Sequence, residues 1–158
     1  MSAAALSPEQ AAFWARFRRE TGETAAGPRG VDRFGDDAEM ADALAALVTA
    51  GRKRATASLA RWYPSAADRP QPGDLWIIEN GAGAPVCVTR TTRVDVQPVH
   101  AVDAAFAFEE GEGDRTLAWW RDAHRAYWLR EAAREGFVYS DDLDVVCERF
   151  ELIWAPAD

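Results

Sequence analysis

Several residue types are scarce in this chain, and each shortage excludes a class of protein. There are two cysteines, Cys87 and Cys147, in apolar strand-like runs with no CxxC pair and no metal-ligand spacing. A disulfide framework and a cysteine-based metal site are therefore excluded, and we expect two buried thiols in a reducing compartment. No apolar run approaches the roughly 18 residues of a membrane span, and the N-terminus has no signal-peptide pattern. We expect a cytoplasmic protein that does not enter a membrane.

Positive charge is also in short supply. The formal net charge is −8 and the isoelectric point is about 4.8, which excludes a protein that grips duplex DNA through many phosphates. The charges are nevertheless segregated along the chain. Residues 52–69 carry five bases and one acid, whereas residues 103–114 carry five acids and no base. A local basic cleft is compatible with this pattern.

Lysine is the scarcest basic residue, because Lys53 is the only lysine among 18 lysines and arginines. A buried lysine can lose its proton near neutral pH and then act as a base or a nucleophile, which arginine cannot do. From composition alone, a solvated lysine on a turn is the simpler interpretation. The residues around Lys53 decide between the two.

The pattern of apolar residues predicts a single α+β domain, a small partly closed β-barrel of about five to six strands with flanking helices. Residues 1–35 are expected to form an N-terminal helix and a loop, and residues 36–158 the core. Ser7 and Gln10 form a capping box at the first helix, Asp36 is expected to cap the second, and Gly51 to end it. The predicted helices span residues 8–21, 36–51, 102–108 and 115–134, and the predicted strands span 53–59, 75–79, 85–96 and 144–154.

Residues 51–56, GRKRAT, match the G-x-K-x-x-T signature of ASCH domains. The order of further blocks extends the match: a PGD turn at 72–74, the acidic segment 109–114 before a helix, and CERF at 147–150 in the last strand. The chain thus resembles bacterial stand-alone ASCH proteins, whose β-barrel is related to PUA domains, over nearly its whole length. It departs from many of them at Ser58, where they carry an arginine, and this puts an arginine–phosphate contact there in doubt.

The resemblance implies a role centred on RNA. Some ASCH proteins cleave single-stranded RNA, and small bacterial members hydrolyse the amide of 4-acetylcytidine with a lysine, a threonine and a glutamate. By position these are Lys53, Thr56 and Glu112, with Glu110 as the alternate acid. A neutral Lys53 would activate the threonine hydroxyl for acyl transfer, whereas a charged Lys53 would stabilise a phosphorane.

One geometric condition applies to this triad. In a regular strand, residues 53 and 56 point to opposite faces because side chains alternate. Lys53 and Thr56 therefore cooperate only if the chain turns just after Gly51.

The substrate is expected to contact the segment that carries the signature. Trp62 is our candidate for stacking on an unpaired base beside a phosphate bound by Arg61. No metal or other cofactor is expected, since the acidic segment lacks EF-hand spacing. His124 is expected on a helix surface, and Glu148 in an ion pair with the strand of Arg90 and Arg93. The full set of expected substrate contacts is Arg52, Arg54, Ser58, Arg61, Trp62 and Tyr63.

We therefore expect a hydrolytic RNA- or nucleotide-binding protein that cleaves single-stranded RNA in a cleft around Lys53. Cleavage is preferred because three arginines surround the lysine and because the chain is longer than the smallest amidohydrolase-type members. One alternative is a 4-acetylcytidine-type amidohydrolase with a Thr-Lys-Glu triad. Another is a non-catalytic module that binds RNA or a modified nucleotide. The expected partners are single-stranded RNA or a modified nucleoside, not duplex DNA, and the chain is expected to be a monomer or weak dimer.

Overall fold

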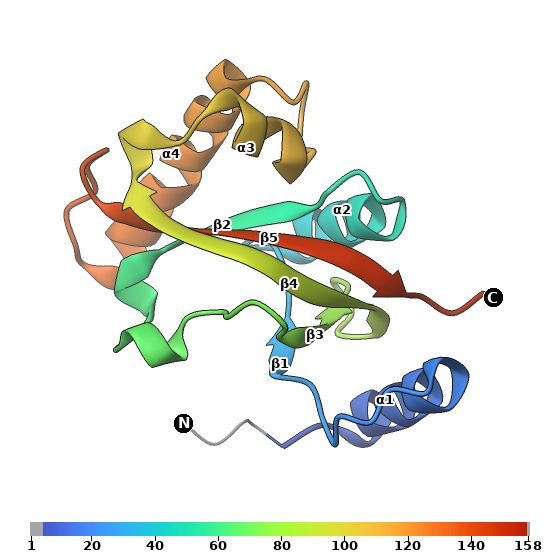
Figure 1. Ribbon diagram of the computed structural model, residues 1–158. Coiled ribbons are helices and arrows are strands. Elements are labelled where there is room, and N and C mark those ends of the chain that lie inside the picture. Colours follow the sequence, from blue (N-terminus) through green and yellow to red (C-terminus); the bar gives the residue numbers. More distant parts are fainter. Residues whose placement is uncertain (1–4, 158) are drawn as a thin grey trace.

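A five-stranded sheet organises the chain in the computed structural model, which describes residues 5–157 (Figure 1). The expectation that the N-terminus carries no signal peptide falls partly on residues 1–4, which lie outside this range. The strand order is β1-β3-β4-β5-β2, and every neighbouring pair is antiparallel except β1 and β3. The strands are β1 (Gly30–Asp32), β2 (Ala55–Leu59), β3 (Leu75–Glu79), β4 (Pro85–Pro98) and β5 (Asp144–Trp154). The sheet curls into a half-barrel, which confirms the predicted α+β class.

Helices cover both faces of this sheet. Helix α1 (Pro8–Thr21) packs Trp14 and Phe17 on one face of β3 and β4, and α2 (Ala38–Thr49) packs on the opposite face. Helices α3 (Ala104–Glu110) and α4 (Leu117–Glu135) cover β2 and β5. The predicted burial of both cysteines is confirmed. Within the described range, no helix has the length and hydrophobicity needed to cross a membrane. Short 3-10 turns follow β2 and β4: Ala60–Trp62, Ala66–Asp68 and Val99–Ala101.

The helix boundaries show one correction. The capping box of Ser7 and Gln10 at α1 is confirmed. At α2 the cap is Asp37, not Asp36, because the Asp37 carboxylate accepts a hydrogen bond from the Met40 amide at 2.7 Å. The Asp36 carboxylate instead pairs with Arg130 of α4 at 3.1 Å. Two adjacent aspartates leave the choice open in the sequence, and the contact with α4 decides it.

Three further segments differ from the prediction. The loop expected at residues 22–35 contains β1, which pairs with β3 and so adds an edge to the sheet. The strand expected at residues 53–59 begins only at Ala55. The acidic segment is only partly a loop, because Glu109 and Glu110 are the last two residues of α3. Gly111 then ends that helix in the left-handed conformation, with φ 73°.

Gly111 brings the acidic segment against the chain that leaves α2, and we expect Gly111→Ala to be much more destabilising than Gly136→Ala. Both glycines have left-handed φ values, 73° and 77°, so alanine costs about 1 kcal/mol at either site. A Cβ at Gly111 would also overlap the Arg52 carbonyl, whereas at Gly136 nothing lies within 4 Å. Urea unfolding should show a loss of about 3 kcal/mol at Gly111. Equal losses at the two positions would contradict this packing.

Candidate functional site

A cavity of about 450 Å³ lies between α2, α4 and the two edge strands of the sheet. Asp32 of β1 and Thr56 of β2 both line it although their strands stand at opposite ends of the strand order, so the curl of the sheet closes the cavity. The volume suits a nucleoside-sized ligand. The polar and charged residues in its lining, apart from tryptophan, are Asp32, Arg33, Lys53, Thr56, Ser58, Tyr63, Glu110, Glu112, His124, Tyr127, Arg130 and Glu148.

Lys53 reaches the cavity because the chain is irregular between α2 and β2. Gly51 has φ 76°, and the amides of Arg52 and Lys53 both donate to the Leu47 carbonyl at 3.0 Å. Regular pairing starts two residues later, at Ala55. The strict alternation of a strand therefore does not separate Lys53 from Thr56, and both side chains line the same cavity. The geometric condition on the predicted triad is met.

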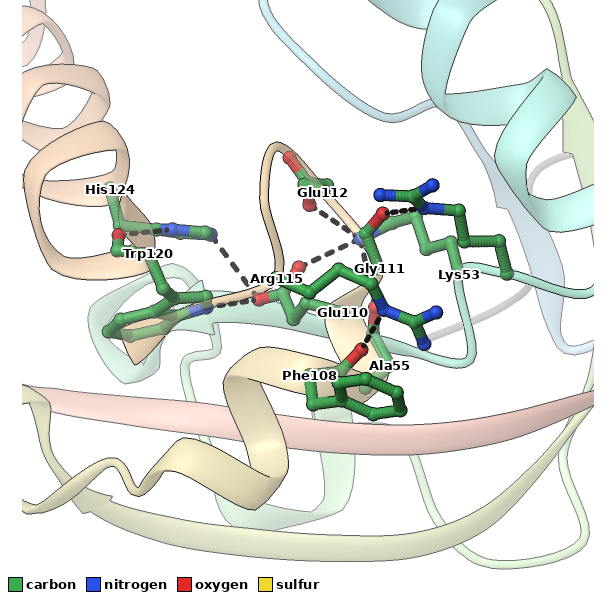
Figure 2. A network of polar contacts seen from close by, with 10 residues as sticks. Lys53, Ala55, Phe108, Glu110, Gly111, Glu112, Arg115, Trp120 and His124 are labelled. Carbon is green, nitrogen blue, oxygen red and sulfur yellow. Dashed lines mark hydrogen bonds and ion pairs between the residues drawn. The ribbon is translucent and has the colours of Figure 1, made fainter. Parts of the chain in front are cut away.

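The Lys53 ammonium is buried and fully hydrogen-bonded (Figure 2). The residue is only 2% exposed. Its Nζ donates to the Ala55 carbonyl, to Glu110 Oε2 and to Glu112 Oε2, each at 2.8 Å. An ammonium has three protons, so none is left over. The lone lysine is therefore not a solvated side chain on a turn.

This environment keeps Lys53 protonated. Burial on its own lowers the pKa of the ammonium, but the charges and hydrogen bonds of Glu110 and Glu112 outweigh burial, and the pKa of Lys53 is raised above its ordinary value. The geometry therefore supports a fixed positive charge at this wall of the cavity. It does not support a neutral amine that acts as a base in the ligand-free protein.

The two glutamates beside Lys53 have opposite pKa shifts. Burial tends to raise the pKa of Glu110, but Lys53 and His124 hold it well below its ordinary value. The pKa of Glu112 is raised, first by burial and then by repulsion from Glu110. Paired carboxyls with separated pKa values are how acid and base roles are divided in active sites. Glu112, which is the more exposed of the two, is the group suited to exchange a proton with a ligand.

His124 belongs to this cluster, and the prediction that it lies on a helix surface is wrong. Its ring stacks on Trp120 with centroids 4.2 Å apart, and its Nε2 lies 3.3 Å from Glu110 Oε1. The Trp120 indole also donates to Glu110 Oε1 at 3.0 Å. Burial lowers the pKa of His124, but the Glu110 carboxylate outweighs it and raises that pKa. One face of α4 carries Trp120, His124 and Trp128, because residues four apart lie on the same side of a helix. From that spacing, the packing of His124 between two tryptophans could have been predicted.

Glu110, Glu112 and His124 offer ligand atoms that all lie within 4.8 Å of one another. That spacing would suit a divalent cation in an otherwise empty acidic site. Here the Lys53 ammonium lies 2.8 Å from both carboxylates and supplies their positive partner. A metal ion would have to displace Lys53, and an ammonium left buried without partners would cost much of the binding free energy.

Of the other predicted contacts, only Ser58 and Tyr63 line the cavity, where their hydroxyl groups lie 2.8 Å apart. Arg52 faces the acidic segment and donates to the carbonyls of Gly111 and Gly113 at 2.8 and 2.9 Å. The residues predicted as substrate contacts that lie outside the cavity lining are Arg52, Arg54, Arg61 and Trp62. Their contact with a substrate stays a prediction.

Two of these residues, Arg61 and Trp62, pack on Phe137. The Arg61 guanidinium lies 3.6 Å from the centre of the Phe137 ring, and Trp62 meets the same ring edge to face. Trp62 is 41% exposed.

Two acidic residues of the cavity were missed or misassigned. Asp32 was not predicted as a site residue, because it lies in a glycine- and proline-rich segment that was expected to be a loop. The predicted ion pair of Glu148 with the Arg90 or Arg93 strand is wrong, since its carboxylate accepts a hydrogen bond from Thr91 at 2.6 Å. Glu148 is opposite Thr56 in the β2–β5 register, so both side chains point into the cavity.

Comparison with known proteins gives matches over most of the chain. The model of the ASCH domain family matches residues 30–154. The crystal structure of an ASCH domain from Lactobacillus crispatus is 37% identical with a TM-score of 0.72, and 77% of each chain is covered. The crystal structure of protein EF3133 from Enterococcus faecalis is 30% identical with a TM-score of 0.82, and 95% of each chain is covered. Among curated proteins no match is found.

Because Lys53 belongs to a buried charge cluster and Arg54 does not, we expect their substitutions to differ widely in their effect on the free energy of unfolding. Lys53→Met should lower the free energy of unfolding at pH 7 by about 3 kcal/mol, because it leaves the Glu110 carboxylate buried without its main partner. The control Arg54→Met removes an exposed side chain with no ion pair within residues 5–157 and should cost about 0.5 kcal/mol or less.

The deficit of Lys53→Met should shrink as the pH falls toward 4.5. Without Lys53 the pKa of Glu110 rises, so this carboxyl takes up a proton and its buried charge is lost. Urea unfolding at the two pH values measures both effects. A similar cost for Lys53→Met and Arg54→Met would show that the cluster does not stabilise the fold.

Proposed function

Since the chain belongs to the ASCH domain family, whose members are generally thought to bind RNA, we propose that it binds single-stranded RNA and hydrolyses it at this cavity. One unstacked nucleotide enters the cavity with the phosphate that is cleaved against the Lys53 and Glu112 wall, and the next phosphate of the strand lies at the mouth. Arg33 and Arg130 are exposed residues of the cavity lining and would face that phosphate. The net charge of −8 repels RNA elsewhere on the surface, so the bound stretch is short.

The observation that carries the proposal is the fixed ammonium of Lys53 in the wall that Thr56 and Glu112 also line. Hydrolysis of a phosphodiester builds negative charge on the phosphorane oxygens. A positive charge that is already oriented in a water-poor site stabilises that charge without reorganisation. Lys53 stays protonated, as such a role requires.

Glu112 supplies the proton transfer. Its raised pKa means that it exchanges a proton more readily near neutral pH than an ordinary glutamate does. In its ionised form it takes the proton of the attacking hydroxyl group, and in its protonated form it returns one to the leaving oxygen. Glu110 holds Lys53 and His124 in place and stays ionised, so it does not compete for this proton.

A second candidate is hydrolysis of an acylated base, and the size and acidity of the cavity favour it. The cavity is the size of a nucleoside, and four of its lining residues are carboxylic acids, which attract a phosphate poorly. The Thr56 hydroxyl makes no hydrogen bond within the described residues and would be the nucleophile. Lys53 would then stabilise the oxyanion, and Glu112, not Lys53, would activate Thr56.

The two reactions are separated by Thr56→Val. The protein should cleave a single-stranded RNA oligonucleotide, Thr56→Val should keep this activity, and Glu112→Gln should lose about 100-fold or more. The reason is that RNA carries its own nucleophile, the 2′-hydroxyl group, whereas both reactions need a proton-transfer group. Asp122→Asn, an exposed acid of α4, is the control, and its activity should match that of the wild type.

The same variants are assayed with 4-acetylcytidine. Deacetylation that disappears in Thr56→Val would replace the RNA cleavage proposal by the second candidate. Tight RNA binding with no turnover of either substrate would overturn both and leave a binding module.

A further inference from the structure

The wall of the cavity formed by β1 and β5 carries two carboxyl groups that the proposed chemistry does not use. Glu148 is only 5% exposed, and its Oε2 accepts from the Thr91 hydroxyl at 2.6 Å. That hydroxyl itself accepts from the Trp76 indole at 3.0 Å, so its proton is directed at Glu148. Asp32 lines the same cavity and is close enough to repel the Glu148 carboxylate. These two hydrogen bonds, from Trp76 to Thr91 and from Thr91 to Glu148, fix the position of the Glu148 carboxyl group.

Neither carboxyl is neutralised by a cation. Within residues 5–157 neither Asp32 nor Glu148 forms an ion pair, and three of their oxygens, Glu148 Oε1 and both of Asp32, have no hydrogen-bond partner. Both residues line the cavity, so these oxygens face open space in which a bound ligand can supply hydrogen bonds. A ligand that leaves such groups unpaired when it covers them loses affinity, so a ligand that matches them is favoured.

The two groups differ in protonation. Burial, followed by repulsion from Asp32, raises the pKa of Glu148 to about 8, and burial raises the pKa of Asp32 to about 6. At pH 7 Glu148 therefore carries a proton and Asp32 mostly does not. Glu148 then offers one O–H donor, and the remaining free oxygens are acceptors. The titratable groups that act on Glu148 or face the same wall are Asp32, Lys53, Tyr63 and Asp74.

We propose that Glu148 and Asp32 form a base-reading subsite for an amino-substituted nucleobase, cytosine or adenine. The Glu148 O–H donates to the ring nitrogen, and the free carboxyl oxygens accept from the neighbouring exocyclic amino group. These bases place one acceptor beside an amino group with two N–H bonds, which matches a wall with one donor and several acceptors. Uracil offers two carbonyl oxygens and a single N–H, so its carbonyls would meet acceptors. This subsite rests on the proposed function, in which a nucleotide enters the cavity.

The test is isothermal titration calorimetry of the whole chain with cytidine, adenosine and uridine. These nucleosides carry no phosphate, so no phosphate group changes its protonation between the pH values compared. At pH 7 cytidine or adenosine should bind about tenfold or more tightly than uridine, since mismatched polar groups stay unpaired. Affinity for the preferred nucleoside should fall between pH 7 and pH 9, because Glu148 loses the proton that it donates. Neither cytosine nor adenine titrates in this range.

Two variants of Glu148 separate base reading from structural effects. Glu148→Gln keeps an N–H donor at the same place, so it should retain the preference and lose the pH dependence. Glu148→Leu should lose the preference for the amino bases. Glu151→Leu changes an exposed glutamate of the same strand and should behave as the wild type. Near-UV circular dichroism confirms that each variant is folded.

The outcomes distinguish this inference from the proposed function. Equal affinity for all three nucleosides, or a pH dependence that survives in Glu148→Gln, overturns the base-reading subsite alone. Absence of binding by any nucleoside overturns both it and the proposed entry of a nucleotide into the cavity.

Discussion

The buried ammonium of Lys53 is the constraint on which the rest of the site depends. Taking an ammonium out of water costs several kcal/mol unless its charge and its protons are matched. The three acceptors of the Lys53 protons come from separate segments. They are the Ala55 carbonyl at the start of β2, Glu110 at the end of α3 and Glu112 just after that helix. The charge is therefore satisfied only when α2, β2 and α3 are assembled together, so folding of this region and formation of the site are one event.

The cavity that results has two chemically different walls. One wall holds the charged cluster of Lys53, Glu110, Glu112 and His124, in which every charge has a partner. The other holds the unpaired carboxyls of Asp32 and Glu148 on strands β1 and β5. The curl of the sheet brings these walls to the same cavity. A bound nucleotide would thus meet a fully paired charge cluster at one side and carboxyl groups with free hydrogen-bonding atoms at the other.

The sequence predicted the parts of this arrangement that depend on local pattern. The bounds of α1 and β5, the capping box at Ser7 and the left-handed Gly51 follow from residue type and spacing, and they agree with the structure. Lys53 was identified by its rarity and by the family signature. What sequence could not supply were contacts between distant segments. Strand β1 is three residues long and exists through its pairing with β3, so neither it nor Asp32 has a local signal.

The central claim is that Lys53 is a permanently charged, buried ammonium, and the chain offers a direct test because this is its only lysine. Protein labelled with ¹⁵N-lysine should give a single side-chain NMR signal, with ammonium protons that exchange slowly with water. That signal should keep the ammonium shift through neutral pH and well above it, since the two carboxylates raise the pKa of Lys53 above its ordinary value. A signal that titrates near neutral pH, or ammonium protons that exchange as fast as those of a free lysine, would contradict the account.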